Sequence, residues 1–118
     1  MKYLLAAAGL VSTLLAVPAF AAGNAEAGAA KALACIGCHG ANGNSTIVPE
    51  LPYTPPNIAA QGPVYIAAQL KLFKEGVRTN PFMMGSAAAL TPEDMLDLAA
   101  HFSTQALTGL EADPALVP

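Results

Sequence analysis

The sequence has little charge and few large side chains. Tryptophan is absent, aromatic residues make up 6% of the 118 residues, and charged residues make up 11%. Five basic residues face eight acidic ones with no run of like charges, so the chain lacks the basic surface that nucleic-acid binding requires. A small domain with so few aromatic residues buries little apolar area, and it usually needs a disulfide, a metal or a cofactor to complete its core.

The N-terminus has the pattern of an export signal. Lys2 precedes an uncharged apolar run, and the segment Pro18-Ala19-Phe20-Ala21 ends in the small-x-small pattern that signal peptidase accepts. An uncleaved membrane anchor is the alternative, because the apolar run is nearly long enough to span a bilayer. Its alanine-rich composition and the cleavage site favour export. We expect residues 1–21 to be a cleaved signal peptide and residues 22–118 to be one domain without stable membrane insertion.

Three segments of that domain favour helix, and none alternates as a strand would. The first runs from Asn24, a good N-cap, to Ala34. The second lies between Gly62-Pro63 and Gly76, and the third begins at Thr91-Pro92, with Asp94 placed for a capping box. The last two helices carry apolar stripes: Ile66, Leu70 and Phe73, then Met95, Leu98, Ala99 and Phe102. The sequence therefore predicts an all-α domain, with proline- and glycine-rich loops over 40–61 and 77–90.

Both cysteines fall in the stretch "CIGCHG", which places Cys35, Cys38 and His39 in a C-x-x-C-H pattern. A redox dithiol would need a strand before the motif, and none is predicted. A zinc site would need His101 as its fourth ligand, without the usual second ligand pair. A disulfide would close a very short loop and stabilise little. Covalent haem attachment uses all three residues: the thiols bind the porphyrin vinyl groups, and the histidine binds iron. The sequence favours one haem c.

A haem iron needs a sixth ligand or an open site, and four residues downstream could supply the ligand. The periodicity of the third helix assigns Met95 to the core, and His101 lies off its apolar stripe, which suits a solvated histidine. Met83 and Met84 lie in a predicted loop, where no helix period explains them. One of these two is therefore the expected partner of His39 across the iron.

Three separated motifs, "CIGCHGANGNS", "PNIAAQGPVYIAAQLKLFKEGVRTNPFM" and "ALTPEDMLDLAAHF", resemble the short bacterial class I cytochromes c, both single-haem carriers and one half of the two-haem carriers. The resemblance implies a helical fold around one haem c, with His/Met-ligated iron. The family's ligand methionine precedes by seven residues the leucine matched by Leu90, which implies Met83, with Met84 as the runner-up. The resemblance also implies that the carbonyl of Pro56 accepts a hydrogen bond from the ring of His39.

The chain departs from the family in three places. The stretch "TIVPELPYTPP" is longer than usual, Ala60 stands where the family has glycine, and His101 stands where the family has an aromatic residue.

The resemblance implies a periplasmic electron carrier rather than an enzyme, with redox proteins as its partners. A haem c subunit of a larger dehydrogenase or oxidase complex is the alternative, and an enzyme or gas sensor with an open sixth site is a third hypothesis. Lys71, Lys74 and Arg78 form a basic cluster that suits either partner docking or an ordinary solvated helix surface.

Overall fold

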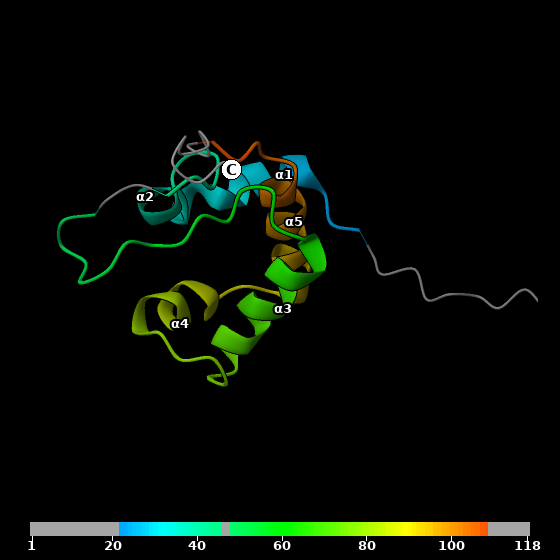
Figure 1. The fold of residues 1–118 in the computed structure, drawn as a ribbon. Helices are drawn as coiled ribbons and strands as arrows, with labels where there is room; N and C mark the ends of the chain where they lie inside the picture. Colours follow the sequence, from blue (N-terminus) through cyan, green and yellow to red (C-terminus); the bar gives the residue numbers. More distant parts are fainter. Residues whose placement is uncertain (1–21, 46–47, 109–118) are drawn as a thin grey trace, which may run out of the picture.

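The regular secondary structure of the described residues is helical. The structure is a computed structural model, and it describes residues 22–45 and 48–108. Within those residues there are helices and connecting loops but no strand, so the expected all-α class is confirmed (Figure 1). The elements are α1, Ala25–Lys31; a 3₁₀ turn, Ala32–Ala34; α2, Ile36–His39; α3, Pro63–Lys74; α4, Pro81–Ala87; and α5, Pro92–Ser103.

Two expectations concern the membrane: a cleaved signal peptide, and no stable membrane insertion of the remaining domain. The expected signal peptide, residues 1–21, lies outside the described residues. Among the helices that are described, none is both long enough and apolar enough to cross a bilayer.

The predicted helix starts are confirmed by their caps. The side-chain oxygen of Asn24 accepts hydrogen bonds from the backbone N–H groups of Glu26 and Ala27, each at 3.0 Å. At α5, the hydroxyl of Thr91 accepts from the N–H of Asp94, and the Asp94 carboxylate accepts from the N–H of Thr91. Both devices satisfy backbone donors that have no partner inside a helix. The first helix differs from expectation at its end, since it stops at Lys31 and continues as the 3₁₀ turn.

The predicted loop over 77–90 is wrong for half of its length, because Met83 and Met84 lie in α4. The helix begins at Asn80, whose side-chain oxygen accepts a hydrogen bond from the N–H of Met83 at 3.0 Å, and Pro81 occupies the first helical position. Asparagine followed by proline is a good helix start. The sequence did not predict α4, because this segment contains a glycine and has no apolar stripe.

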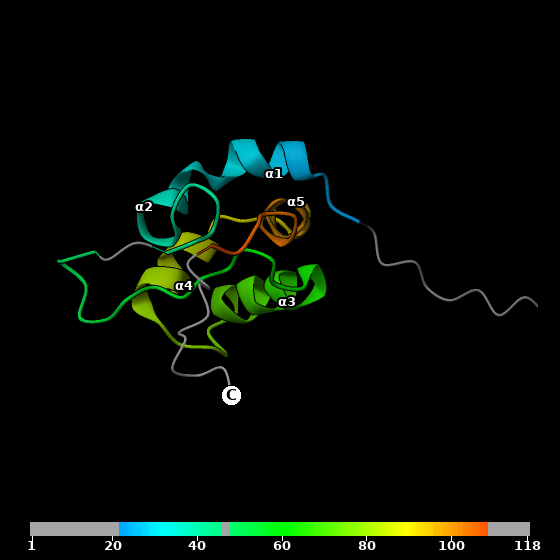
Figure 2. The same cartoon turned by 45° about the horizontal axis from the view of Figure 1, so that its top comes forward.

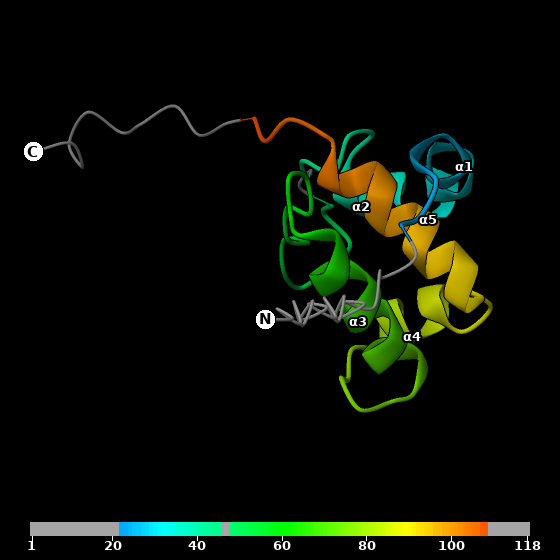
Figure 3. The same ribbon diagram turned by 90° about the vertical axis from the view of Figure 1, so that its right-hand side faces the viewer.

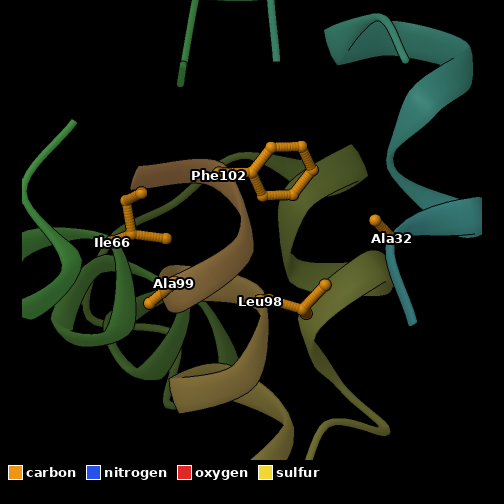
Figure 4. Packing of buried hydrophobic residues seen from close by; sticks show 5 residues of the cluster. All are labelled: Ala32, Ile66, Leu98, Ala99 and Phe102. Atoms are coloured by element: carbon orange, nitrogen blue, oxygen red, sulfur yellow. The ribbon is translucent and has the colours of Figure 1, made fainter. Parts of the chain in front are cut away.

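The apolar core is small and centres on α5. Figure 4 shows Leu98 and Phe102 of this helix between Ile66 of α3 and Ala32 of the 3₁₀ turn. The two α5 side chains are at most 2% exposed, so the predicted inner stripe is confirmed. Several apolar side chains next to this cluster are only partly buried: Cys35, Ile58, Ala67, Leu70 and Leu90. The protein part of the core therefore leaves several of its apolar side chains partly in contact with water.

Helix α5 lies between α1 and α3 (Figures 2 and 3). The contact with α1 is close at Gly28, where a Cβ atom would lie 2.0 Å from the carbonyl oxygen of Asp97. Any larger residue at position 28 would push the two helices apart. Glycine costs helix stability in isolation, so its value here is the short distance between the helices.

A polar cluster also joins α1 to α5. Asp97 is 5% exposed, and its carboxylate accepts hydrogen bonds from the backbone N–H of Asn24 at 2.7 Å and from the ammonium group of Lys31 at 2.6 Å. Lys31 also pairs with Asp94 at 2.8 Å. The hydrogen bond from Lys31 lowers the pKa of Asp97, and the same lysine, with Thr91, lowers the pKa of Asp94 to about 2. No motif or periodicity in the sequence indicates this role for Asp97.

We expect Asp97→Asn to lower the free energy of unfolding at neutral pH, because the variant loses the ion pair with Lys31. The lowered pKa of Asp97 means that this stabilisation is present above the unfolded value of about 3.9 and is lost as pH falls through the lower pKa of the folded state. Denaturant unfolding at a series of pH values should show the wild type and the variant converging over that window. Glu93→Gln, at an exposed position of the same helix, is the control and should leave the pH profile close to that of the wild type.

Candidate functional site

The two cysteines and His39 lie within one turn of helix. Cys35 immediately precedes α2, and Cys38 and His39 are its last two residues. The backbone N–H of His39 donates to the carbonyl oxygen of Cys35 at 2.9 Å. Residues three and four positions apart are neighbours on a helix surface, so Cys38 and His39 both lie next to Cys35. The C-x-x-C-H spacing thus becomes one local arrangement of two thiols and an imidazole.

The imidazole of His39 is buried and oriented. The residue is 7% exposed, and its Nδ1 atom lies 2.9 Å from the carbonyl oxygen of Pro56. A carbonyl oxygen can only accept, so Nδ1 carries the hydrogen and the lone pair of the neutral ring is on Nε2. A hydrogen bond of this kind fixes the ring of a metal-binding histidine and raises its basicity. His39 is therefore prepared to bind a metal through Nε2.

Backbone contacts hold the segment around Pro56 in place. The carbonyl oxygen of Gly43 accepts hydrogen bonds from the N–H groups of Ile58 and Ala59, at 2.8 and 3.0 Å. Gly40, which ends α2, has φ of +77°, and a Cβ atom there would lie 2.0 Å from the carbonyl oxygen of Asn44. Glycine adopts this conformation without steric cost, so the chain can turn directly after His39 and return to meet the segment that carries Pro56.

The two methionines of α4 are both half-buried. Figures 1 and 2 place α4 and α2 on the same side of α3 and α5, and the loop that contains Pro56 runs between them in Figure 1. Adjacent helical residues point about 100° apart, so Met83 and Met84 face different directions. The methyl group of Met84 lies 3.9 Å from the position that a Cβ of Gly76 would occupy, which turns this side chain toward the end of α3.

The other two candidate ligands belong to helix packing. Met95 is 5% exposed in the core, as its periodicity predicts. His101 is not a fully solvated residue: it is half-buried, its ring makes an edge contact with Phe102 at 4.9 Å between centroids, and its Cβ lies close to Gly28 where α1 crosses α5.

The alternatives to haem attachment find little support here. Neither cysteine forms a disulfide. Burial raises the pKa of the Cys35 thiol, whereas reactive redox cysteines have lowered pKa values. Within residues 22–45 and 48–108, no group of three or more histidine, cysteine, aspartate or glutamate side chains is arranged to hold a metal ion.

The residues present fit a haem. Cys35 itself packs against the core cluster and is only partly buried, as are Ile58, Leu70 and Leu90 around the same cluster. A large, flat, apolar group attached at Cys35 and Cys38 would cover these side chains and remove them from water. His39 offers nitrogen to its iron, and α4 offers a thioether from the same side of the molecule.

A separate apolar groove of about 660 Å³ lies along α3 and α5, near the start of α1. It is lined by small and apolar side chains, among them Val64, Ala67 and Ala99, and by none of the cysteines, His39, Met83 or Met84. The groove therefore contains none of the candidate haem-binding residues.

A helical domain with two neighbouring thiols and a buried, oriented imidazole defines a covalent haem protein. The sequence profile of the cytochrome c family matches residues 25–106, and the chain belongs to that family. Cytochromes c hold haem c covalently and transfer electrons, and Cys35, Cys38 and His39 form the corresponding attachment motif.

Three relatives illustrate the similarity. The chain is 43% identical to cytochrome c4 of Pseudomonas aeruginosa over 112 residues, which cover 92% of this chain and 53% of that protein. It is 34% identical to cytochrome c-554(548) of Halomonas halodenitrificans over 91 residues, which cover 71% of this chain and 99% of that protein. A solved structure of Acidithiobacillus ferrooxidans cytochrome c4 matches with a TM-score of 0.62 and 30% identity, covering 74% of this chain and 52% of the other.

These matches confirm the class I cytochrome c fold that the resemblance implies. The chain spans about half the length of the cytochromes c4 that it matches, and it corresponds to one half of those proteins.

The basic cluster makes contacts within the chain. Lys71 lies 3.6 Å from Glu75, and Lys74 donates to the carbonyl oxygen of Leu90. Arg78 donates to the side chain of Gln69 at 2.6 Å, and its guanidinium lies 4.6 Å from the centre of the Phe73 ring. These contacts favour a structural role for the cluster over a docking role.

The departure at Ala60 has a visible backbone consequence. Ala60 has φ of +57°, the left-handed region that favours glycine, and its N–H donates to the carbonyl oxygen of Phe102 at 3.1 Å. A residue with a Cβ loses about 1–2 kcal/mol in this conformation. The turn is kept although the glycine is absent.

Ala60→Gly should therefore raise the free energy of unfolding by about 0.5–1 kcal/mol, since relief of the left-handed conformation exceeds the entropy that glycine adds to the unfolded chain. Denaturant unfolding of the haem-loaded protein measures this change in the free energy of unfolding. The control, Ala88→Gly, has φ of −55° at an exposed position and should lower stability instead. A loss of stability in both variants would contradict the assignment of strain to Ala60.

Proposed function

We propose that the chain is a periplasmic one-electron carrier with a single covalent haem c, whose iron is bound by His39 and Met83. The observation that carries the proposal is the hydrogen bond from Nδ1 of His39 to the carbonyl of Pro56, because it leaves Nε2 as the metal-binding atom. The expected export signal and the redox partners that a carrier requires belong to the same proposal.

The assignment of Met83 rests on two observations. Both methionines of α4 are half-buried on the side of the molecule that carries α2. Met84 extends toward Gly76, which leaves Met83 as the residue free to turn in another direction. The position of Met83 seven residues before Leu90 agrees with the family pattern that the sequence resembles.

Each residue has a distinct part in this function. When bound, haem supplies a one-electron couple between ferric and ferrous iron. Cys35 and Cys38 keep the cofactor attached while the protein moves between partners. The imidazole of His39 would bind the iron through Nε2, and the thioether of Met83 would favour the ferrous state and raise the potential. The apolar side chains of Ile58, Leu70 and Leu90 exclude water, which disfavours the additional charge of the ferric state.

The exported protein should have a mass that exceeds the polypeptide mass by one haem, and its reduced form should show the sharp absorption bands of haem c. The haem should stay with the polypeptide in acidified organic solvent. In a Cys35→Ala, Cys38→Ala double variant that solvent should extract the haem, because no covalent bond from a cysteine sulfur to the haem remains. Ser86→Ala is the control and should retain its haem. Absence of the sharp bands in the wild type would contradict the proposal.

Met83→Ala should open the sixth position of the iron. We expect the reduced variant to bind carbon monoxide at neutral pH, the weak far-red band of thioether-bound ferric haem to disappear, and the reduction potential to fall by part of the range of about 0.8 V that axial ligands control. Met84→Ala should keep the band and should not bind carbon monoxide. Ready binding by the wild type would favour a gas-binding protein instead, and a reversed pattern would move the ligand to Met84.

A second experiment separates the free carrier from the haem c subunit of a larger dehydrogenase or oxidase complex. Size exclusion of a native periplasmic extract should give the haem protein at low mass. Elution together with a flavin- or quinone-containing protein would support the subunit hypothesis.

A further inference from the structure

The long proline-rich loop contacts one proposed iron ligand, His39, and the start of the helix that carries the other, Met83. At one position the carbonyl of Pro56 accepts the hydrogen bond from His39. Three residues earlier, the hydroxyl of Tyr53 accepts a hydrogen bond from the side-chain Nδ2 of Asn80 at 2.8 Å. Asn80 is the N-cap of α4, the helix that carries Met83. This part of the loop is the stretch that is longer than usual for the family.

Asn80 transmits the contact to the backbone of Met83. Its Oδ1 atom accepts a hydrogen bond from the N–H of Met83 at 3.0 Å, while its Nδ2 atom donates to Tyr53. The two ends of one planar amide are thus held by two different segments. Rotation of that amide would break both hydrogen bonds, so Tyr53 fixes the orientation in which Asn80 caps α4.

Tyr53 makes a second contact with α4 through its ring. The ring meets Phe82 edge-on, with centroids 6.4 Å apart and planes at 68°, and Phe82 is the residue before Met83. Tyr53 is 40% exposed and Phe82 is 53% exposed, so neither ring is part of the core. The contacts of Tyr53 with the N-cap of α4, Asn80, and with its second residue, Phe82, indicate a role in the placement of the first turn.

We infer that Tyr53 is a positioning residue for Met83: through Asn80 and Phe82 it holds the first turn of α4, and so it limits how often the methionine leaves the iron. This inference rests on the proposed function, because it needs Met83 as a ligand. An iron–thioether bond opens when the methionine side chain rotates away or when the first turn of α4 shifts, and the second route requires movement of the Met83 backbone. A hydrogen bond that stabilises the first turn of α4 therefore slows the opening.

The test is the rate at which imidazole replaces the methionine in the ferric haem protein, at imidazole concentrations where opening limits the rate. In Tyr53→Phe the ring contact remains and the hydrogen bond is lost. We expect opening to be about fivefold faster, as the loss of one hydrogen bond of ordinary net strength implies. The matched control is Tyr65→Phe, since Tyr65 is 50% exposed on α3, and its rate should equal that of the wild type.

A double-mutant cycle tests the path through Asn80. Asn80→Ser keeps a capping hydroxyl but loses the donor to Tyr53, so it should also speed opening, and the addition of Tyr53→Phe should give no further increase from this hydrogen bond. Asn80→Asp keeps the cap and accepts a hydrogen bond from the Tyr53 hydroxyl, so it should restore a rate close to that of the wild type.

The outcomes distinguish this inference from the proposed function. If the wild type shows the far-red thioether band and Tyr53→Phe opens at the wild-type rate, or the two substitutions act additively, the inference is wrong and the ligand assignment stands. If the wild type lacks that band, the ligand assignment is wrong and the inference is overturned with it. Faster opening with an unchanged unfolding midpoint would support positioning over a general loss of stability.

Discussion

The hydrogen bond between Nδ1 of His39 and the carbonyl of Pro56 connects the cysteine-containing helix to the rest of the proposed haem site. It determines which nitrogen of the ring is available, and it can form only because the chain turns at Gly40 and because Gly43 holds the backbone of Ile58 and Ala59. The site is thus built from backbone geometry as much as from side chains. The metal-binding atom is prepared by groups that never touch the metal.

Helix α5 holds in place the helices that surround the cysteine and histidine motif. It contributes the largest of the fully buried side chains, Leu98 and Phe102, contacts α3 through the apolar core, and holds α1 through Gly28 and the buried carboxylate of Asp97. Because α1 leads directly into the motif of Cys35, Cys38 and His39, the position of the motif depends on the α1–α5 contact. The two ends of the described chain thereby fix the part that binds the cofactor.

The features that could be predicted from the sequence are those that depend on residues close together in the chain. Caps and prolines located the starts of α1, α3 and α5, apolar periodicity located the buried face of α5, and the C-x-x-C-H spacing identified the attachment site. Helix α4 was missed because its signal is a cap without an apolar stripe. The roles of Asp97 and Tyr53 could not be predicted, since each depends on partners 27 to 73 positions away that only the folded chain brings close. A carboxylate on a helix and a tyrosine in a loop look like ordinary surface residues until the fold is known.

The covalent length of the segment from Tyr53 to Pro56 also limits how far apart its two contacts can lie. Three residues span at most roughly 10 Å even when fully extended. The carbonyl that orients His39 and the hydroxyl that holds the cap of α4 are therefore tied to points on one short length of chain. The two sides of the proposed iron site cannot separate widely without the loss of at least one of these hydrogen bonds. A loop that reads as irregular in the sequence thus sets an upper limit on how far apart the two sides can move.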